Sequence, residues 1–413
     1  MLCAKHTNRA RRCPLPADTT AAVEDLADAK APEPARTALL RAALLRAAPA
    51  LGLFVAARLT GLSLMAGWAW HIGRRPRAIL GRAWDSDWYM LIAEHGYGRV
   101  LTWPGAVQND LAFFPLYPGL VRALSYVVPG VTSGTLGLLI SWSAALVAAG
   151  GIYAIGERLY GRRVATVLVL LWALLPHSIV LTMAYTEPLL TAFAAWSLYA
   201  VLTRRWVWAG VLAALAGLSR PNGIAVAAAV VCVAAVELVR LARRERRTEW
   251  RPWFAAALAP LGWCGYVLFV GVRTGDPLGG YFAVQRGWTS QFDFGAGALR
   301  VVRDIVLRPA VFSVTMALLI VLASVVLGAL LVLERPPAAL LVYTGVLLLI
   351  TLGGSGFFES KPRFLLPAFP LLLPIALGLT RARPGAAVAV VTALAGLSFG
   401  YGTYLLTLSP IAL

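Results

Sequence analysis

Charged side chains are scarce in this sequence, making up only 14% of its 413 residues, while 59% are hydrophobic. A soluble domain needs charged residues to cover its surface, so this scarcity excludes a soluble globular protein. The mean hydropathy of +0.74 is typical of a chain that lies mostly in a lipid bilayer. We therefore predict an all-α membrane protein that crosses the bilayer many times.

Cysteine and histidine are also rare, at four residues each. Cys3 and Cys13 lie in the polar N-terminal stretch, Cys232 and Cys264 lie in apolar segments, and no CxxC pair occurs. This pattern predicts neither a disulfide framework nor a structural zinc site. The histidines lack the paired spacing of metal ligands, so we expect neither a metal ion nor another cofactor.

Acids are the scarcer charge, with 19 Asp and Glu against 37 Lys and Arg, which gives a net charge of +18. In a membrane protein such an excess reflects basic loops on the inner side and contact with anionic lipids. We therefore expect membrane lipids as partners and no nucleic acid.

The N-terminal stretch differs in composition from the rest of the chain. Residues 1–46 are rich in Ala, Pro and Arg without a long apolar run, which predicts a disordered cytoplasmic tail. Residues 47–413 form the predicted membrane domain. The apolar segment 113–129 contains Pro115, Pro118 and Arg122, so we expect it to be re-entrant or interfacial. About eleven other segments are apolar enough to span a bilayer: 49–70, 132–156, 164–184, 188–203, 206–219, 223–241, 253–272, 310–333, 338–353, 364–380 and 385–407.

Basic residues in the short connections indicate the orientation of these segments. With a cytoplasmic N-terminus, every inner connection carries arginine, as the positive-inside rule requires. The arginines between 74 and 82 depart from the rule, but they lie in a long outer connection, which translocates largely regardless of charge. We predict a multi-pass cell-membrane protein whose site is on the outer face, because five polar segments emerge there: 84–88, 185–188, 219–223, 274–308 and 359–363.

The first outer connection contains a predicted helix. Gly96 and Gly98 follow it and end it. We expect this short helix to lie on the membrane surface with its aromatic side down. Five residues recur at the spacing of one helix face: Trp84, Trp88, Leu91, Ile92 and His95.

Two acids near the start of this helix are candidates for chemistry. Asp85 and Asp87 are two residues apart, about 200° around a helix, so they point in opposite directions and cannot form a carboxylate pair. We take Asp85 as the functional acid. An alternative role for Asp85 is to cap the helix by accepting a hydrogen bond from the Trp88 amide. Asp87 suits the helix dipole.

Cations and aromatic rings accompany these acids on the predicted outer face. Arg363, Arg220 and Lys361 can hold a phosphate through charge-assisted hydrogen bonds. Trp84 and Trp88 can stack on a sugar, as can Trp288. A carboxylate such as Asp85 can take the proton of an incoming hydroxyl. Because cations can stabilise a phosphate leaving group, these parts suit glycosyl transfer from a lipid-phosphate sugar.

Ordered motifs between about residues 50 and 380 resemble the PIG-V type mannosyltransferases of the GT-C superfamily, which include GPI mannosyltransferase II and its bacterial relatives. Any one motif is weak, and the ordered set is fairly specific. The motifs are Trp84-Asp85 with Trp88-Tyr89, Ile92-Ala93 and Gly96-Tyr97; Phe113-Phe114-Pro115-Leu116-Tyr117-Pro118; Tyr185-Thr186-Glu187-Pro188; Arg220-Pro221-Asn222-Gly223; and Lys361-Pro362-Arg363-Phe364.

The resemblance implies a GT-C fold, a polyprenyl-phosphate-linked mannose donor and transfer with inversion to a hydroxyl of a lipid-linked or cell-surface glycan acceptor. It also implies that Asp85 is the base. Tyr117, Glu187 and Asn222 fall in its motifs and are candidate substrate contacts. The sequence departs from the family pattern at two prolines that replace serines, Pro188 and Pro221, and at the additional acid, Asp87. If Asp87 is the base, the Asp85 assignment is wrong while the class stands.

Structural roles and other functions remain alternatives. Glu187 before a proline also suits the first turn of a helix, and the three cations also suit anchors at lipid headgroups. A lipid or glycolipid flippase would place charges near the bilayer midplane and show paired halves. Here the charges gather at helix ends, and only Arg58 lies mid-span, where we expect it to pair with a buried acid or carbonyl. A non-catalytic scaffold for envelope synthesis is the third alternative.

Overall fold

The computed structural model describes residues 33–243 and 249–411. The chain divides into two units between Ala48 and Pro49. Of the predicted tail, residues 1–32 lie outside the described part. The helix α2, Glu33–His71, begins before the predicted end of that tail, because the segment from residue 35 is rich in Ala, Leu and Arg, which are strong helix formers. The site described below lies in the second unit.

Apart from one hairpin, the described chain is helical, with short 3-10 turns labelled η. In chain order the remaining elements are α3 Pro76–Arg82, α4 Asp85–His95, β1 Val100–Trp103, β2 Ala106–Asn109, η2 Asp110–Ala112, α5 Leu116–Val127, α6 Ser133–Tyr160, α7 Arg162–Ala173, η3 Ser178–Thr182, α8 Glu187–Leu202, α9 Trp206–Ser219, η4 Pro221–Gly223, α10 Ile224–Arg243, α11 Trp250–Leu258, α12 Leu261–Arg273, α13 Gly280–Gly287, α14 Ala296–Leu307, α15 Phe312–Glu334, α16 Ala338–Gly353, η5 Phe358–Ser360, α17 Lys361–Phe364, η6 Phe369–Leu372, α18 Leu373–Arg381 and α19 Pro384–Thr407.

The hairpin pairs β1 with β2 in antiparallel register, with Val100 opposite Asn109 and Trp103 opposite Ala106. Pro104 and Gly105 make the connection between the two strands. Pro104 is the second and Gly105 the third residue of this tight turn. Gly105 has a φ of 83°, which glycine adopts readily at that position.

Six helices in the described residues are long and apolar enough to cross a membrane, and a seventh span results if the pair 358–364 and 369–381, bent by 81°, is counted as one. Shorter apolar helices, α8, α9 and α16, accompany them. The protein is therefore a multi-pass, mostly helical membrane protein. The count by length and composition is lower than the predicted eleven, because several predicted segments form helices too short to pass that test alone.

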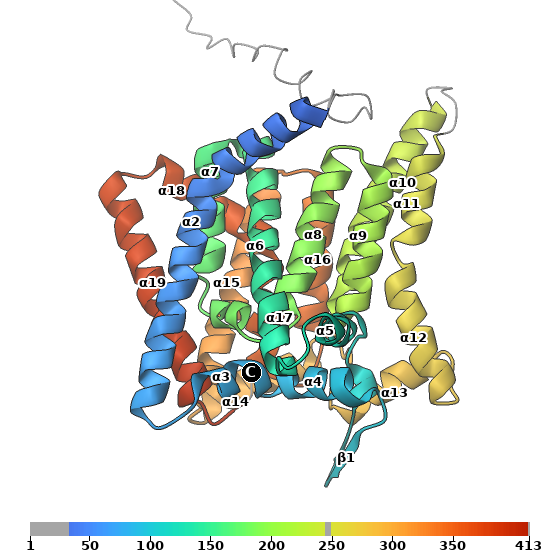
Figure 1. Cartoon of the computed structure of the whole chain (residues 1–413), viewed down its shortest axis with the longest axis vertical. Coiled ribbons are helices and arrows are strands. Elements are labelled where there is room, and N and C mark those ends of the chain that lie inside the picture. The colour runs from blue at the N-terminus through green and yellow to red at the C-terminus, as the bar shows by residue number, and fades with distance from the viewer. Residues whose placement is uncertain (1–32, 244–248, 412–413) are drawn as a thin grey trace, which may run out of the picture. The chain divides into compact units, whose positions relative to one another are not determined.

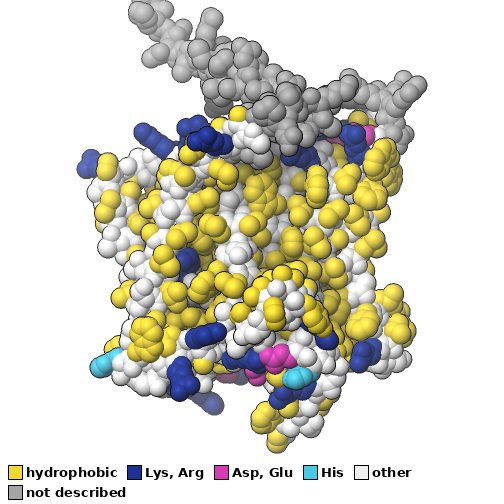
Figure 2. Space-filling model, in the orientation of Figure 1, with side chains coloured by type: hydrophobic (Ala, Val, Ile, Leu, Met, Phe, Trp, Pro, Cys, Tyr) yellow, Lys and Arg dark blue, Asp and Glu magenta, His cyan; other side chains and the backbone are white. Residues whose placement is uncertain are grey.

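The long helices of the second unit run side by side, while α3 and α4 lie across one end of them and α13 lies at the same end (Figure 1). On the face shown in Figure 2, hydrophobic side chains cover the length of the helices and charged side chains gather mainly at the ends. α5, formed by part of the predicted re-entrant segment 113–129, is seen almost end-on and therefore crosses the long helices.

α4 forms where the sequence predicts it and ends at Gly96, whose amide donates to the Ile92 carbonyl. Its buried face differs from the predicted aromatic stripe, because Ser86, Tyr89, Met90 and Ala93 face inward together with Ile92, whereas the predicted stripe member His95 has a side chain 75% exposed. Close packing explains the difference. A Cβ at Gly137 of α6 would lie 2.8 Å from Met90 Cε. Because glycine has no side chain, Met90 of α4 can pack directly against α6 at this point.

Arg58, the mid-span cation, has the partner that the sequence predicted. Its side chain is buried, and Nη1 donates to the Ser178 carbonyl at 2.5 Å. This bond ties α2 to η3, so the charge has a packing role away from the site described below.

Candidate active site

A cavity of about 760 Å³ lies at the end of the helices where α4 and α13 are found. Its volume is typical of small-molecule sites, which span roughly 300–1,000 Å³. Segments from the first and last thirds of the chain meet there, because α4, η4, α13 and α17 all contribute to its wall. Seven of the ten predicted site residues line it: Trp84, Asp85, Trp88, Arg220, Asn222, Lys361 and Arg363.

Four charged residues form a continuous ion-pair network at the cavity, with three of them in its wall and Glu187 behind it. Arg363 Nη1 lies 2.8 Å from Asp85 Oδ2, and its Nε lies 3.3 Å from Glu187 Oε1. The same Glu187 oxygen lies 2.6 Å from Arg220 Nη1. The Glu187 side chain is 1% exposed and the two guanidinium groups 6% and 8%. Because a buried charge is costly without a partner, each member requires the others.

Helix starts position both acids of this network. Asp85 is the first residue of α4, and Glu187 is the first residue of α8, directly before Pro188. The positive end of a helix dipole favours a carboxylate at both places. Glu187 therefore combines the helix-start role with a place in the ion-pair network, since its carboxylate also bridges Arg220 and Arg363, but it does not itself line the cavity.

The N-cap of α4 is Trp84, and no side-chain cap bond is present, so the predicted capping of the Trp88 amide by Asp85 is wrong. The Asp85 carboxylate is turned to Arg363 instead. Trp84 adopts φ 52° and ψ −120°, a conformation that residues with a Cβ rarely take. Strain of this kind costs on the order of 1–3 kcal/mol and persists where the surroundings hold it.

Two hydroxyl groups extend the network away from the charges. Arg220 Nη1 donates to Thr186 Oγ1 at 2.9 Å, and that oxygen lies 3.2 Å from the hydroxyl of Tyr89. Tyr89 also lines the cavity. Burial raises the pKa of Tyr89 to about 12, so the phenol is neutral at physiological pH and can act as a donor.

Lys361 begins α17 and is held by main-chain carbonyls. Its Nζ donates to the carbonyl oxygens of Thr351 and of Gly354, the latter at 2.7 Å. The residue is 3% exposed and lines the cavity. Both partners are neutral, and an ammonium has three donors, so these bonds leave one donor and the positive charge available.

Aromatic rings form a second part of the wall. Trp88 stacks on Phe113 with ring centroids 5.7 Å apart, and Trp288 meets both rings edge-on at 5.2 and 5.3 Å. The Trp288 indole donates to the Asn109 carbonyl at 2.9 Å, which fixes its orientation. Flat apolar faces next to charged groups suit a ligand that carries both a sugar ring and a phosphate.

Asp87 and Tyr117 lie elsewhere. The Asp87 carboxylate is 48% exposed and pairs with Arg82 at 3.2 Å, on the side of α4 away from Asp85. Tyr117 is fully buried between helices, where its hydroxyl donates to the Gly137 carbonyl at 2.8 Å and lies 2.9 Å from Ser141 Oγ. These contacts give Asp87 the geometry of a surface ion pair and Tyr117 that of a packing residue.

Many residues of the wall were not predicted as site residues, and four of the wall or its network carry polar groups of interest: Tyr89, Thr186, Gln285 and Arg286. Tyr89 and Thr186 lie inside the ordered motifs, and their hydroxyls show no spacing signal that separates them from core residues. Gln285 and Arg286 lie in a polar segment that the sequence singles out, but without a helical partner or motif to mark them. Their segment, α13, is held at the cavity by packing against α12, η2 and β2.

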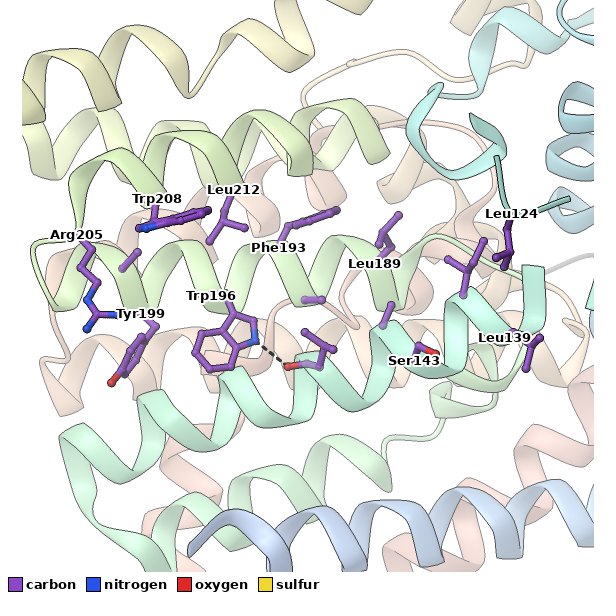
Figure 3. A pocket seen from close by; sticks show the side chains of 15 residues that line it. Leu124, Leu139, Ser143, Leu189, Phe193, Trp196, Tyr199, Arg205, Trp208 and Leu212 are labelled. Carbon is purple, nitrogen blue, oxygen red and sulfur yellow. Dashed lines mark hydrogen bonds between the residues drawn. The ribbon is translucent and has the colours of Figure 1, made fainter. Parts of the chain in front are cut away.

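A second cavity of about 600 Å³ lies between α6, α8 and α9 (Figure 3). Phe193, Trp208 and Leu212 are among the side chains that line it, and Trp196 donates to the Val147 carbonyl at 2.9 Å. Arg205 is the one charged side chain among its lining residues. No acidic side chain is among the described residues that line this second cavity, so the cavity offers no chemistry comparable to that of the first one. Among residues 33–243 and 249–411, no three His, Cys, Asp or Glu side chains gather as metal ligands.

Comparison with known proteins gives a family for part of the chain. Residues 115–261 match the model of the dolichyl-phosphate-mannose-protein mannosyltransferase family. This part of the chain is mannosyltransferase-like. GPI alpha-1,6-mannosyltransferase 2 of Rattus norvegicus is 33% identical over 159 residues, which are 36% of this chain and 30% of that protein. The predicted resemblance to GPI mannosyltransferase II is thus confirmed, although the chain spans under a third of that relative's length.

Two solved structures are also similar. The Archaeoglobus fulgidus oligosaccharyltransferase in the apo form has a TM-score of 0.46 at 13% identity, covering 86% of this chain and 55% of that chain. ArnT from Cupriavidus metallidurans bound to undecaprenyl phosphate has a TM-score of 0.48 at 16% identity, covering 83% and 63%. At these scores the likenesses support neither a fold nor a substrate for this chain.

Proposed function

We propose that this protein is a GT-C type membrane mannosyltransferase. It transfers mannose from a polyprenyl-phosphate donor to a hydroxyl of a lipid-linked or cell-surface acceptor, with inversion and without a metal ion. The observation that carries the proposal is a cavity lined by one carboxylate, Asp85, which is paired with Arg363, together with further cations and aromatic rings. The mannosyltransferase family match and the GPI mannosyltransferase relative support the reaction class.

Asp85 is the proposed base. It is 20% exposed, lines the cavity and is oriented by Arg363 at 2.8 Å, so an acceptor hydroxyl that enters the cavity can reach it. Its carboxylate would accept the hydroxyl proton while the oxygen attacks the anomeric carbon. Asp87 is the weaker candidate, because it pairs with Arg82 on the exposed side of α4.

The cations of the wall supply the positive potential for the donor phosphate. Arg363, Arg220 and Lys361 are proposed to stabilise it, and Glu187 holds the two arginines in place. Trp84, Trp88 and Asn222 line the space that remains for the sugar. Preorganised charges in a water-poor site stabilise a leaving phosphate more strongly than the same charges in water.

The proposed topology has eleven spans, a cytoplasmic N-terminus and the site on the outer face. The shorter helices α7, α8, α9 and α16 then count as spans alongside the long ones, and α4 lies in the interface. The basic connections after α6 and α8 and the basic last turn of α10 support this orientation, because they lie at the opposite end of the helices from α4 (Figure 1).

Sugar transfer by purified protein tests the proposal. The wild type and Asp85→Asn are each supplied with synthetic polyprenyl-phosphate-mannose carrying a labelled sugar and with a membrane-lipid acceptor extract, with and without a chelator. We expect transfer by the wild type, loss in the variant with the fold retained, and no effect of the chelator. Labelled donor that crosses vesicle membranes without sugar transfer would instead support a flippase.

A further inference from the structure

Two of the cations that line the cavity form no ion pair with a described carboxylate. Of the described side chains that line it, four are cationic, Arg220, Arg286, Lys361 and Arg363, and one is acidic, Asp85. Glu187 lies directly behind the wall and pairs with Arg220 and Arg363. Two carboxylates therefore compensate two guanidinium groups. Among the described cations of the wall, Lys361 and Arg286 form no ion pair, although the charge of Asp293 acts on Lys361 through space, so they keep more of their positive charge for an anionic ligand than the two paired arginines do.

Arg286 is the exposed member of this pair. It lies in α13, and within residues 33–243 and 249–411 its guanidinium makes no hydrogen bond, ion pair or ring contact. The other arginines of the wall have their donors engaged by carboxylates. A guanidinium with free donors at a cavity mouth matches a phosphate in both charge and planar geometry.

The residues beside Arg286 hold it at the cavity. Gln285 Nε2 donates to the Ala112 carbonyl at 3.3 Å, and Trp288 Nε1 donates to the Asn109 carbonyl at 2.9 Å. A Cβ on Gly287 would lie 2.4 Å from the Val107 carbonyl oxygen. α13 therefore packs against β2 more closely at this residue than any side chain would allow. Both flanks of Arg286 are thus anchored to the first outer connection.

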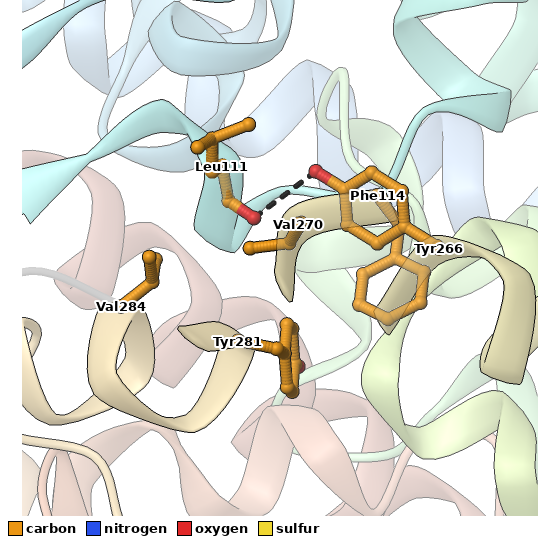
Figure 4. Packing of buried hydrophobic residues seen from close by; sticks show 6 residues of the cluster. All are labelled: Leu111, Phe114, Tyr266, Val270, Tyr281 and Val284. Carbon is orange, nitrogen blue, oxygen red and sulfur yellow. Dashed lines mark hydrogen bonds between the residues drawn. The ribbon is translucent and has the colours of Figure 1, made fainter. Parts of the chain in front are cut away.

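A buried cluster supports the same contact from beneath. Leu111 and Phe114 of the first outer connection pack with Tyr266 and Val270 of α12 and with the α13 residues Tyr281 and Val284 (Figure 4). The Tyr266 hydroxyl lies 3.0 Å from the Leu111 carbonyl and 2.7 Å from that of Phe113. α13 is therefore a fixed part of the wall, and Arg286 is carried on a rigid element.

We propose that Arg286, together with the free donor of Lys361, binds the phosphate that leaves when the sugar is transferred. The inference rests on the proposed function. In that reaction the acceptor oxygen bonds to the anomeric carbon, and its proton passes to Asp85. The bond from that carbon to the phosphate oxygen breaks and leaves its electron pair on the phosphate. The phosphodiester with one negative charge becomes a phosphomonoester with about two at neutral pH. Two cations without an ion-pair partner among the described residues match that charge.

Binding of the product tests this assignment apart from catalysis. Polyprenyl phosphate is titrated into purified wild type, Arg286→Ala and Arg286→Lys, and tryptophan fluorescence is followed, since Trp88 and Trp288 lie in the wall. Arg308→Ala, an exposed arginine at the end of α14, is the matched control. We expect Arg286→Ala to weaken binding roughly 10- to 100-fold, Arg286→Lys to weaken it less, and the control to match the wild type.

Two competitors identify which part of the ligand Arg286 contacts. Neutral polyprenol should bind the wild type and Arg286→Ala equally, because the lost contact is to the phosphate. Dioleoyl phosphatidic acid carries the same phosphomonoester on a different tail. If it binds as tightly as polyprenyl phosphate and with the same dependence on Arg286, the site is a general lipid-headgroup site and the leaving-group assignment is wrong.

The outcomes also separate this inference from the proposed function. Wild type that transfers mannose, with Arg286→Ala unchanged in product affinity and in KM for the donor, overturns the phosphate site and leaves the function standing. Wild type that binds polyprenyl phosphate through Arg286 but transfers no sugar overturns the function and leaves the site standing. Wild type that does neither overturns both.

Discussion

Asp85 and Arg363 form an ion pair at 2.8 Å, with one residue opening α4 near the start of the second unit and the other in α17 near its end. The pair closes the cavity wall, because Arg363 also contacts Glu187 and through it Arg220. One of the two acids at the start of α4 is thereby selected and oriented. The neighbouring acid, Asp87, stays in contact with Arg82 at the surface.

Exchange of each acid for its amide should separate the two aspartates. We expect Asp85→Asn to lower kcat for mannose transfer by roughly 10²–10⁴-fold, the usual range for loss of a general base. Asp87→Asn breaks an exposed ion pair worth about 0–1 kcal/mol, so kcat should stay close to that of the wild type. Initial rates at saturating donor measure both. Equal loss in the two variants would contradict the assignment of Asp85.

Removal of the bridging carboxylate should destabilise the fold. Glu187→Ala leaves the buried guanidinium of Arg220 unpaired and takes one of two partners from Arg363, which costs on the order of 3–5 kcal/mol. The melting temperature of the purified protein should fall clearly. Asp304→Ala breaks an exposed pair with Arg303 at 3.4 Å and serves as the control, with little change expected. An unchanged melting temperature in Glu187→Ala would mean that the network is solvated.

A methyl group at Gly287 should displace α13. The added Cβ would lie 2.4 Å from the Val107 carbonyl oxygen, so Gly287→Ala must move the helix away from β2 and carry Trp288 with it. We expect altered tryptophan fluorescence and a higher KM for the donor. Gly265→Ala in α12 is the matched control, because a Cβ there meets nothing within 4 Å. A Gly287→Ala protein with wild-type fluorescence and KM would exclude this close approach.

Because of the backbone conformation at position 84, replacing Trp84 by glycine and by alanine should give proteins of different stability. Both Trp84→Gly and Trp84→Ala remove the indole, but only glycine takes φ 52° and ψ −120° without strain. We expect the glycine variant to be the more stable by roughly 1–2 kcal/mol. Thermal unfolding of the two variants side by side measures the difference. Higher stability of the alanine variant would show that Trp84 relaxes in the unliganded protein.

The sequence predicted most of what depends on local pattern. Apolar runs indicated the spans, the 3.6-residue spacing and Gly96 indicated α4, and the ordered motifs indicated a mannosyltransferase-like chain. Motifs at helix ends also placed Asp85, Arg220 and Lys361 among candidates that prove to share one cavity. Helical periodicity, the length of a span and the charge of a connection depend only on residues that are close in the sequence. They can therefore be predicted from the sequence alone.

Tertiary structure alone decided which charges are paired and which are free. The sequence treated Arg220, Arg363 and Lys361 as equivalent cations, whereas the fold pairs the first two with carboxylates and holds the third by carbonyls. The fold also brings Arg286 to the cavity wall, because Gly287 permits a close approach of α13 to β2. These contacts join residues far apart in the chain, and their distances follow from how helices pack, which no local pattern encodes.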